Sequence, residues 1–249
     1  MGWIHSRIGD GMKTAVKLRM AASGQATAPP HVAWLESWWA NDLVIADSDT
    51  VSTWPGRSGA FALDQPSPAR RPVYDASELS LAGRPVVVFD GVDDFMRLAS
   101  WGGTITQPYS YVVIGVMRSV SASYICFVDR AHNLIPSTGS FFGVEMGQWR
   151  LWAGTLGFLA GAPTTGPTAL RALVNDSSSR VVHNGAHVTS GAVGSGELIG
   201  LTVGANRGDN DASALSVAFV GAYDGDVSTD SGWPAFVAWA AATYGVVLS

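Results

Sequence analysis

The feature that most constrains the fold is the pattern of residues 32–249, in which short runs rich in β-branched and aromatic residues alternate with turn signals. Many of the 29 glycines and 12 prolines stand between these runs. Strands that follow one another with almost no helix between them indicate an antiparallel sandwich or barrel. The strands that the sequence predicts cover residues 84–90, 108–117, 124–128, 140–145, 148–152, 169–174, 180–183, 186–188, 197–203 and 214–223.

Three local patterns refine this prediction. Asn184-Gly185 lies between two apolar runs and predicts a two-residue hairpin with a type I′ turn. An apolar stripe over residues 233–244, with Pro234 in its first turn and Gly245 at its end, predicts a short C-terminal helix. A weaker helix is expected over residues 31–40, which hold three tryptophans.

Residues 1–30 differ from the rest and are interpreted as an arm, separated by Ala28-Pro29-Pro30 from a single domain over residues 31–249. Residues 16–20 alternate apolar and basic side chains as a strand would, whereas apolar residues at positions 8, 12, 16 and 20 follow a helical period. The arm is therefore either a disordered terminus or an extension that docks on a neighbouring subunit. The basic residues of this expected assembly arm are Arg7, Lys13, Lys17 and Arg19.

Charge and composition exclude several classes of protein. The arm carries a net charge of +3, so residues 31–249 carry −8, which argues against nucleic acid as a partner. Residues 231–249 have no charged side chain, but proline and glycine interrupt them, so no membrane span is expected. The single cysteine, Cys126, excludes an internal disulfide. The arm has no continuous apolar segment that would serve as a secretory signal.

A series of short motifs resembles the laminin-G-like, concanavalin A-like lectin and glucanase modules found in bacterial surface proteins and phage virion proteins. Its members are Trp38-x8-Asp47, Val51-Ser-Thr-Trp54, Arg57-Ser-Gly59, Arg71-Pro-Val-Tyr74 and, most specific of all, Phe89-Asp-Gly-x-Asp-Asp-Phe95. The resemblance covers residues 34–249. It implies an all-β jelly roll, a two-sheet antiparallel sandwich of the concanavalin A type, whose concave face or edge loops often bind carbohydrate.

No catalytic pattern is recognised, and the chain is expected not to be an enzyme. A glucanase of this kind needs carboxylates alternating along one strand, and Glu145 has no partner of that sort. The sequence Gly191-Ala-Val-Gly-Ser-Gly lies between strands, unlike a hydrolase nucleophile turn. His183 and His187 flank the hairpin turn on opposite faces, which excludes a shared zinc ion.

Carbohydrate binding is the best-supported chemistry for a surface site, because aromatic rings stack on sugar rings. Trp101 lies beside two glycines, and Trp149 and Trp152 flank Arg150, which makes these four residues the candidate sugar site. Calcium is the only cofactor considered. Its candidate ligands are the oxygen-bearing side chains of one loop, Asn206, Asp209, Asn210 and Asp211. The alternative is that these side chains are only solvated. The carboxylates at positions 90, 93 and 94 are expected to stabilise a turn.

The expected function is that of a non-enzymatic phage virion protein of the minor tail or baseplate type, with a lectin-like domain that contacts envelope carbohydrate of the host. It would be assembled in the host cytoplasm, attach to other virion proteins through the arm, and occur as a homo-oligomer or within a lattice. Two alternatives stay open. One is a capsid or tail decoration protein that binds no glycan, and the other is a secreted bacterial adhesin.

Overall fold

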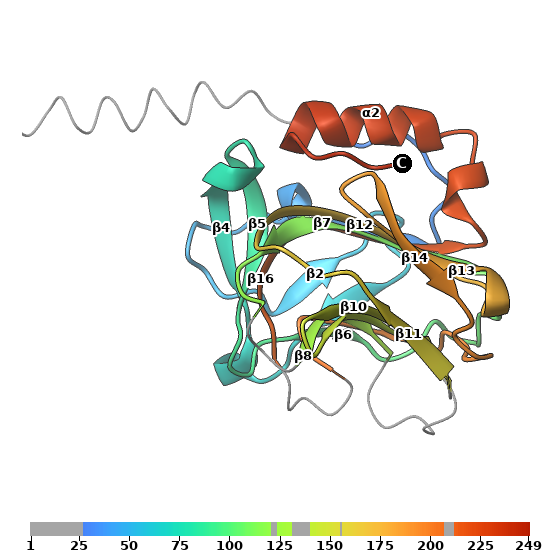
Figure 1. Ribbon diagram of the computed structural model, residues 1–249. Helices are drawn as coiled ribbons and strands as arrows, with labels where there is room; N and C mark the ends of the chain where they lie inside the picture. The colour runs from blue at the N-terminus through green and yellow to red at the C-terminus, as the bar shows by residue number, and fades with distance from the viewer. Residues whose placement is uncertain (1–26, 121–123, 131–139, 155, 207–211) are drawn as a thin grey trace, which may run out of the picture.

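The computed structural model describes residues 27–120, 124–130, 140–154, 156–206 and 212–249, and it contains two eight-stranded antiparallel sheets packed face to face (Figure 1). The expected all-β sandwich with a short C-terminal helix is thereby confirmed. The four arm residues Arg7, Lys13, Lys17 and Arg19 lie outside the described residues, so their role stays a prediction.

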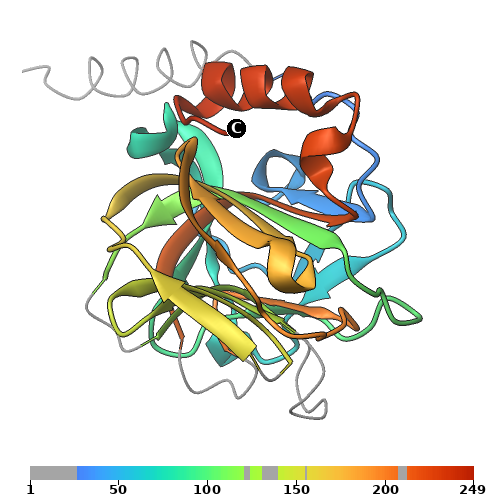
Figure 2. The same cartoon turned by 45° about the vertical axis from the view of Figure 1, so that its right-hand side comes forward.

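The first sheet, here called the covered sheet, has a helix on its outer face. Its strands run in the order β14 (Ala186–Gly191), β13 (Ser179–His183), β12 (Gly166–Val174), β7 (Tyr109–Met117), β16 (Ala214–Asp224), β5 (Arg84–Asp90) and β4 (Val73–Glu78), and β1 (Glu36–Trp39) also pairs with β16. The helix is α2 (Trp233–Tyr244), which lies across this sheet in both ribbon views (Figures 1 and 2).

The second sheet, here called the open sheet, lies on the side away from α2 (Figure 2). Its strands run in the order β11 (Leu156–Ala160), β10 (Gln148–Ala153), β9 (Ser140–Glu145), β8 (Tyr124–Asp129), β15 (Leu201–Val203), β6 (Met96–Leu98), β3 (Ala62–Asp64) and β2 (Thr53–Pro55). Short 3-10 helices occupy connections: η1 (Ala40–Asp42), η2 (Pro68–Arg70), η3 (Leu79–Leu81), η4 (Asp176–Ser178) and η5 (Val227–Thr229).

Two apolar cores hold these three layers together. The larger core fills the space between the sheets and buries Trp38, Trp54 and Trp149. The smaller core lies between the covered sheet and α2, where Phe236 and Trp239 pack on strand residues. The covered sheet is therefore apolar on both faces, which explains why β7 reads as a continuous apolar run.

The prediction of a helix over residues 31–40 is wrong, because this segment contains strand β1 paired with β16. Trp38 belongs to the core between the sheets and Trp39 to the core under α2. A strand buried on both faces loses the apolar and polar alternation by which strands are recognised, and three tryptophans then resemble a helical stripe.

The hairpin and the C-terminal helix are confirmed. Asn184 and Gly185 have φ angles of 47° and 76°, as a type I′ turn requires. Helix α2 has Pro234 in its first turn and ends at Gly245, which has a φ of 70°. No helix in the described ranges is long and apolar enough to span a membrane.

Candidate functional site

The outer face of the open sheet carries one straight row of side chains. Directly paired residues of antiparallel strands point to the same face, so the strand registers define this row without reference to side-chain conformation. Spanning six strands at a spacing of roughly 4.8 Å, it is about 24 Å long. We call it the cross-strand row, and it consists, from β10 to β3, of Trp152, Phe141, Asp129, Thr202, Arg97 and Asp64.

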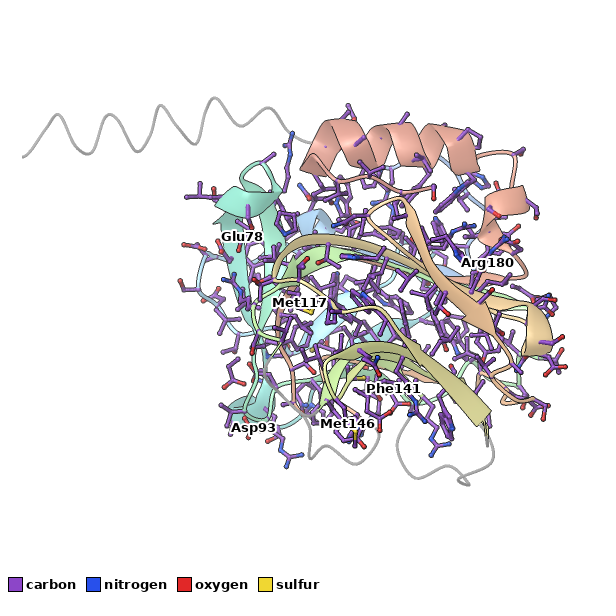
Figure 3. All side chains as sticks on the ribbon, in the orientation of Figure 1. Glu78, Asp93, Met117, Phe141, Met146 and Arg180 are labelled. Carbon is purple, nitrogen blue, oxygen red and sulfur yellow. The ribbon has the colours of Figure 1, made fainter. Side chains whose placement is uncertain are left out.

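A cavity of about 340 Å³ lies at the β10 end of this row, which we call the tryptophan cavity. Figure 3 shows Phe141, one of its lining residues, on the open sheet. Its volume falls at the lower end of the range typical of small-molecule sites. The residues that line it come from strands β8, β9 and β10 and from the segment after β15, and they are Tyr124, Asp129, Phe141, Glu145, Arg150, Trp152 and Asn206.

Three polar side chains of the tryptophan cavity hold one another in place. The hydroxyl of Tyr124 donates a hydrogen bond of 2.8 Å to Oε1 of Glu145. The guanidinium of Arg150 forms an ion pair with Oε2 of the same carboxylate. Both carboxylate oxygens are thus occupied, which fixes the orientation of Glu145 and leaves Arg150 with further N–H groups.

The aromatic residues of the cavity lie close to the sheet because glycines stand beside them. A Cβ atom added at Gly157 on β11 would lie 2.9 Å from Cδ1 of Trp152. One added at Gly143 on β9 would lie 2.9 Å from Cζ of Phe141. Each ring therefore extends over a glycine, and larger residues at these positions would force it to move.

Two charged residues next to the cavity are buried. Asp129 is 3% exposed, and Arg130 is fully buried. The guanidinium carbon of Arg130 lies 5.3 Å from the centroid of the Trp152 ring, within the range of a cation–π interaction. The backbone N–H of Arg130 donates a 2.7 Å hydrogen bond to Oδ1 of Asp129. The buried carboxylate of Asp129 thus keeps a hydrogen-bond donor, as a buried charge requires.

A second cavity of about 580 Å³, the arginine cavity, lies at the other end of the cross-strand row. Its lining includes Asp64 and Arg97 of the row, together with the aromatic residues Phe61 and Phe95. The guanidinium carbon of Arg97 lies 4.6 Å from the centroid of the Phe95 ring. Both cavities thus combine aromatic rings with an arginine and a carboxylate.

Hydrogen bonds connect Arg97 of the arginine cavity through the middle of the row to Arg130 next to the tryptophan cavity. Nε of Arg97 donates to Oγ1 of Thr202 at 3.2 Å. The same hydroxyl donates to the backbone oxygen of Arg130 at 2.9 Å. The side chains between the two cavities therefore form part of one polar network.

Of the four residues expected to form a sugar site, the structure brings two together. Arg150 and Trp152 both line the tryptophan cavity. The expected exposure of Trp149 and Trp101 is wrong, since both lie in the core between the sheets. Trp149 packs 4.8 Å from the ring of His183, and Trp101 packs 5.1 Å from Phe61.

The predicted calcium loop is described only at its start. Asn206 lines the tryptophan cavity, whereas Asp209, Asn210 and Asp211 lie outside the described residues, so calcium binding there stays a prediction.

At the other acidic cluster, the expected turn stabilisation is present. Oδ1 of Asp90 accepts a hydrogen bond of 2.7 Å from the N–H of Val92, and Oδ2 of Asp94 accepts one of 3.1 Å from the N–H of Asp90. Carboxylate oxygens of Asp90, Asp93 and Asp94 lie within 4.8 Å of one another. Burial, reinforced by these neighbouring carboxylates, raises the pKa of Asp94 to about 6.

The sequence analysis missed Tyr124, Asp129, Phe141 and Glu145 as members of one site. Glu145 was dismissed because no second carboxylate alternates with it along its strand, but Asp129 on the neighbouring strand lines the same cavity. Asp129 and Glu145 could have been predicted to share a site only from the strand register between residues 124–129 and 140–145. A bulge between Cys126 and Val128 shifts that register and hides it from simple counting.

The two histidines are arranged as expected. His183 pairs with Ala186 and His187 with Val182, so their side chains lie on opposite faces of the hairpin. Burial lowers the pKa of His183, whose Nε2 has no hydrogen-bond partner among the described residues.

Comparison with known proteins identifies no family, because no family model matches the chain and no curated protein matches it significantly. Solved structures do share its fold. Trypanosoma rangeli sialidase matches with a TM-score of 0.53 and 11% identity, over 93% of this chain and 38% of that chain. A mutant of it displaying trans-sialidase activity matches with a TM-score of 0.56 and 12% identity, over 93% and 38%.

Domain 4 of AbnA, a GH43 extracellular arabinanase from Geobacillus stearothermophilus, in complex with arabinotriose, matches with a TM-score of 0.53 and 15% identity, over 81% of this chain and 97% of that domain. The chain spans less than two fifths of the length of the sialidases it matches. At these identities the likeness concerns the fold, a β-sandwich that occurs in carbohydrate-active proteins.

These comparisons correct one expectation from the sequence. The chain was expected not to be an enzyme, and the solved structures that share its fold include sialidases and a domain of an arabinanase. The absence of alternating carboxylates on one strand is therefore no basis for excluding glycosidase-like chemistry, since two carboxylates from different strands line one cavity.

Proposed function

We propose that this protein binds carbohydrate on the outer face of its open sheet, with the tryptophan cavity as the principal site. The single observation that carries the proposal is the combination in one cavity of an aromatic ring, Trp152, with hydrogen-bonding groups of both kinds. Sugars present apolar C–H faces and rings of hydroxyl groups that both donate and accept hydrogen bonds. A site for them needs a ring to stack on and polar groups around it, as this cavity has.

The polar groups of the cavity suit hydroxyls in particular. Arg150 offers N–H donors, whereas Asp129 is a carboxylate that accepts hydrogen bonds. Since the Glu145 ion pair orients Arg150 and the backbone N–H of Arg130 orients Asp129 before any ligand arrives, little side-chain freedom is lost on binding.

The cross-strand row offers sugars two separate sites, one at each of its ends. The row is about 24 Å long, several times the width of one sugar ring, and chemically similar cavities lie at its ends. Because Thr202 is fully buried and Asp129 is 3% exposed in the middle of the row, a sugar would contact Trp152 in one cavity or Arg97 in the other.

The biological setting we propose is a phage particle, on which this domain contacts glycan of the host envelope. This part rests on the resemblance of the sequence motifs between Trp38 and Phe95 to modules of virion proteins. The carbohydrate site does not depend on it, because a bacterial adhesin would use the same cavity.

The proposal is tested with the full chain on an array of linear oligosaccharides of one to six units, covering gluco-, xylo-, arabino-, galacto- and N-acetylglucosamine series. Any series that binds is then titrated by calorimetry. We expect saturable binding that weakens about tenfold or more in Trp152→Ala, the loss of one well-packed aromatic anchor. Cleavage of the probes is followed in the same samples, because Asp129 and Glu145 line the cavity.

The matched control is His187→Ala, which removes an exposed ring from β14 of the covered sheet and should leave binding unchanged. Each titration is run with calcium and with a chelator, since Asn206 lines the cavity. Absence of binding to every series and to host-type cell envelopes would refute the proposal and favour a decoration protein. Binding that Trp152→Ala leaves intact would refute the assignment of the site.

A further inference from the structure

The solvent-facing side of helix α2 lacks polar residues. A helix at a protein surface normally places charged or polar side chains toward water. No charged residue occurs anywhere in positions 231–249. The exposed residues of α2 are instead small and apolar, and we call them the alanine face: Pro234, Ala235, Ala238, Ala241 and Ala242.

The first described residue lies beside this helix. Nε1 of Trp239, in the middle of α2, donates a hydrogen bond of 2.8 Å to the backbone oxygen of Thr27. Thr27 is the first described residue, and 26 residues precede it. The described chain therefore begins in contact with α2.

The sequence before Thr27 contains an apolar stripe that suits the alanine face. Ile8, Met12, Val16 and Met20 recur every four residues, which places them along one side of a helix. As a helix, residues 8–20 would be about 20 Å long at 1.5 Å per residue, and the 12 residues of α2 are about 18 Å long. The stripe and the alanine face thus match in length and in character.

We propose that residues 8–20 pack against the alanine face of α2 in the same molecule. The seven residue steps from Met20 to Thr27 can span up to about 24 Å, enough to reach either end of α2 from its middle. Because the segment is tethered beside its binding face, its effective concentration there is about millimolar, which favours docking within one chain over docking on a second copy.

An unusual property of the sequence makes the proposal testable. Lys13 and Lys17 are the only lysines in the chain, so a lysine-specific protease cleaves within the docking segment and nowhere else. The rate of this cleavage in the intact protein reports how often the segment is undocked, provided that undocking is fast relative to cleavage.

The experiment compares the full chain with Ala238→Glu, which places a charge in the middle of the alanine face. We expect the variant to be cleaved about tenfold faster or more, since cleavage follows the population of the open form. The control, Ala69→Glu, adds the same charge at an exposed alanine of η2 and should be cleaved as slowly as the wild type.

A second variant separates loss of docking from damage to the domain. Met12→Asp changes the segment alone, and it should be cleaved as fast as Ala238→Glu while the melting of the domain stays cooperative. Equal cleavage of the wild type and both variants would overturn the proposal. Protection that disappears on dilution would overturn it too, because docking on a neighbouring subunit, the expectation from the sequence, would then explain the protection.

Discussion

Asp94 provides the sharpest prediction about stability, because its carboxyl is buried beside two others. Burial, reinforced by Asp90 and Asp93, raises its pKa from 3.8 to about 6. A carboxyl with a raised pKa binds its proton more tightly in the folded state than in the unfolded state. The fold is therefore most stable below pH 4 with respect to this group and loses that stability as pH rises through 6.

The size of the effect follows from the shift. Two pKa units at 1.36 kcal/mol each give a penalty of about 3 kcal/mol above pH 7, as an upper bound. Asp94→Asn keeps an oxygen that can accept the hydrogen bond from the N–H of Asp90 and removes the charge. We expect the variant to melt at most about 6–12 °C higher than the wild type at pH 8.

The assay is thermal unfolding at pH 8 and pH 4 in the presence of a chelator, so that no bound cation offsets the repulsion. At pH 4 the gain should largely vanish, because the wild-type carboxyl is then protonated. Asp93→Asn is the matched control, and its gain should stay below about 1 kcal/mol because this residue is partly exposed. If Asp94→Asn is less stable at pH 8, or its gain is equal at both pH values, the burial argument is refuted.

Three further variants test other parts of the structure. Phe236→Ala removes a fully buried ring between α2 and the covered sheet, and chemical denaturation should show a loss of about 3–5 kcal/mol; a loss below 1 kcal/mol would mean that α2 contributes little. The pKa of His183 is lowered by burial, so on going from pH 7 to pH 5 this histidine is protonated mainly in the unfolded chain, which lowers the stability of the fold. His183→Phe should therefore lose less stability than the wild type over this range, and an unchanged pH dependence would contradict the argument. Gly143→Ala places a Cβ atom 2.0 Å from the backbone oxygen of Ile125, so it should lower the melting temperature and weaken glycan binding together; a variant that melts and binds like the wild type would show that β8 and β9 tolerate the change.

The sequence predicts the fold class well because turn signals and β-branched runs are local properties. The strands at 84–90 and 140–145 have the expected bounds, and the hairpin has its expected turn at Asn184-Gly185, although its second strand extends to Gly191. The three-residue strands β2, β3 and β6 were not predicted, since so short a segment carries no measurable period and depends on its neighbours for pairing.

The candidate site was harder to predict because it depends on the register between strands. Trp149 and Trp152 are three residues apart on β10, so they point to opposite faces, and only Trp152 is accessible from the outer face. One face of β10 is covered by the other sheet. The outer face is open because α2 packs on the covered sheet and not on this one. Asp129 joins the site only through its pairing with Phe141 across a bulged ladder.

The most direct test of the proposed function is to locate a bound sugar. A crystal structure of the full chain with the tightest-binding oligosaccharide should show a sugar ring over Trp152 in the tryptophan cavity, with hydrogen bonds to Arg150 or Asp129. A sugar bound at a sheet edge or against α2, with the outer face of the open sheet empty, would contradict the assignment of this face as the carbohydrate site.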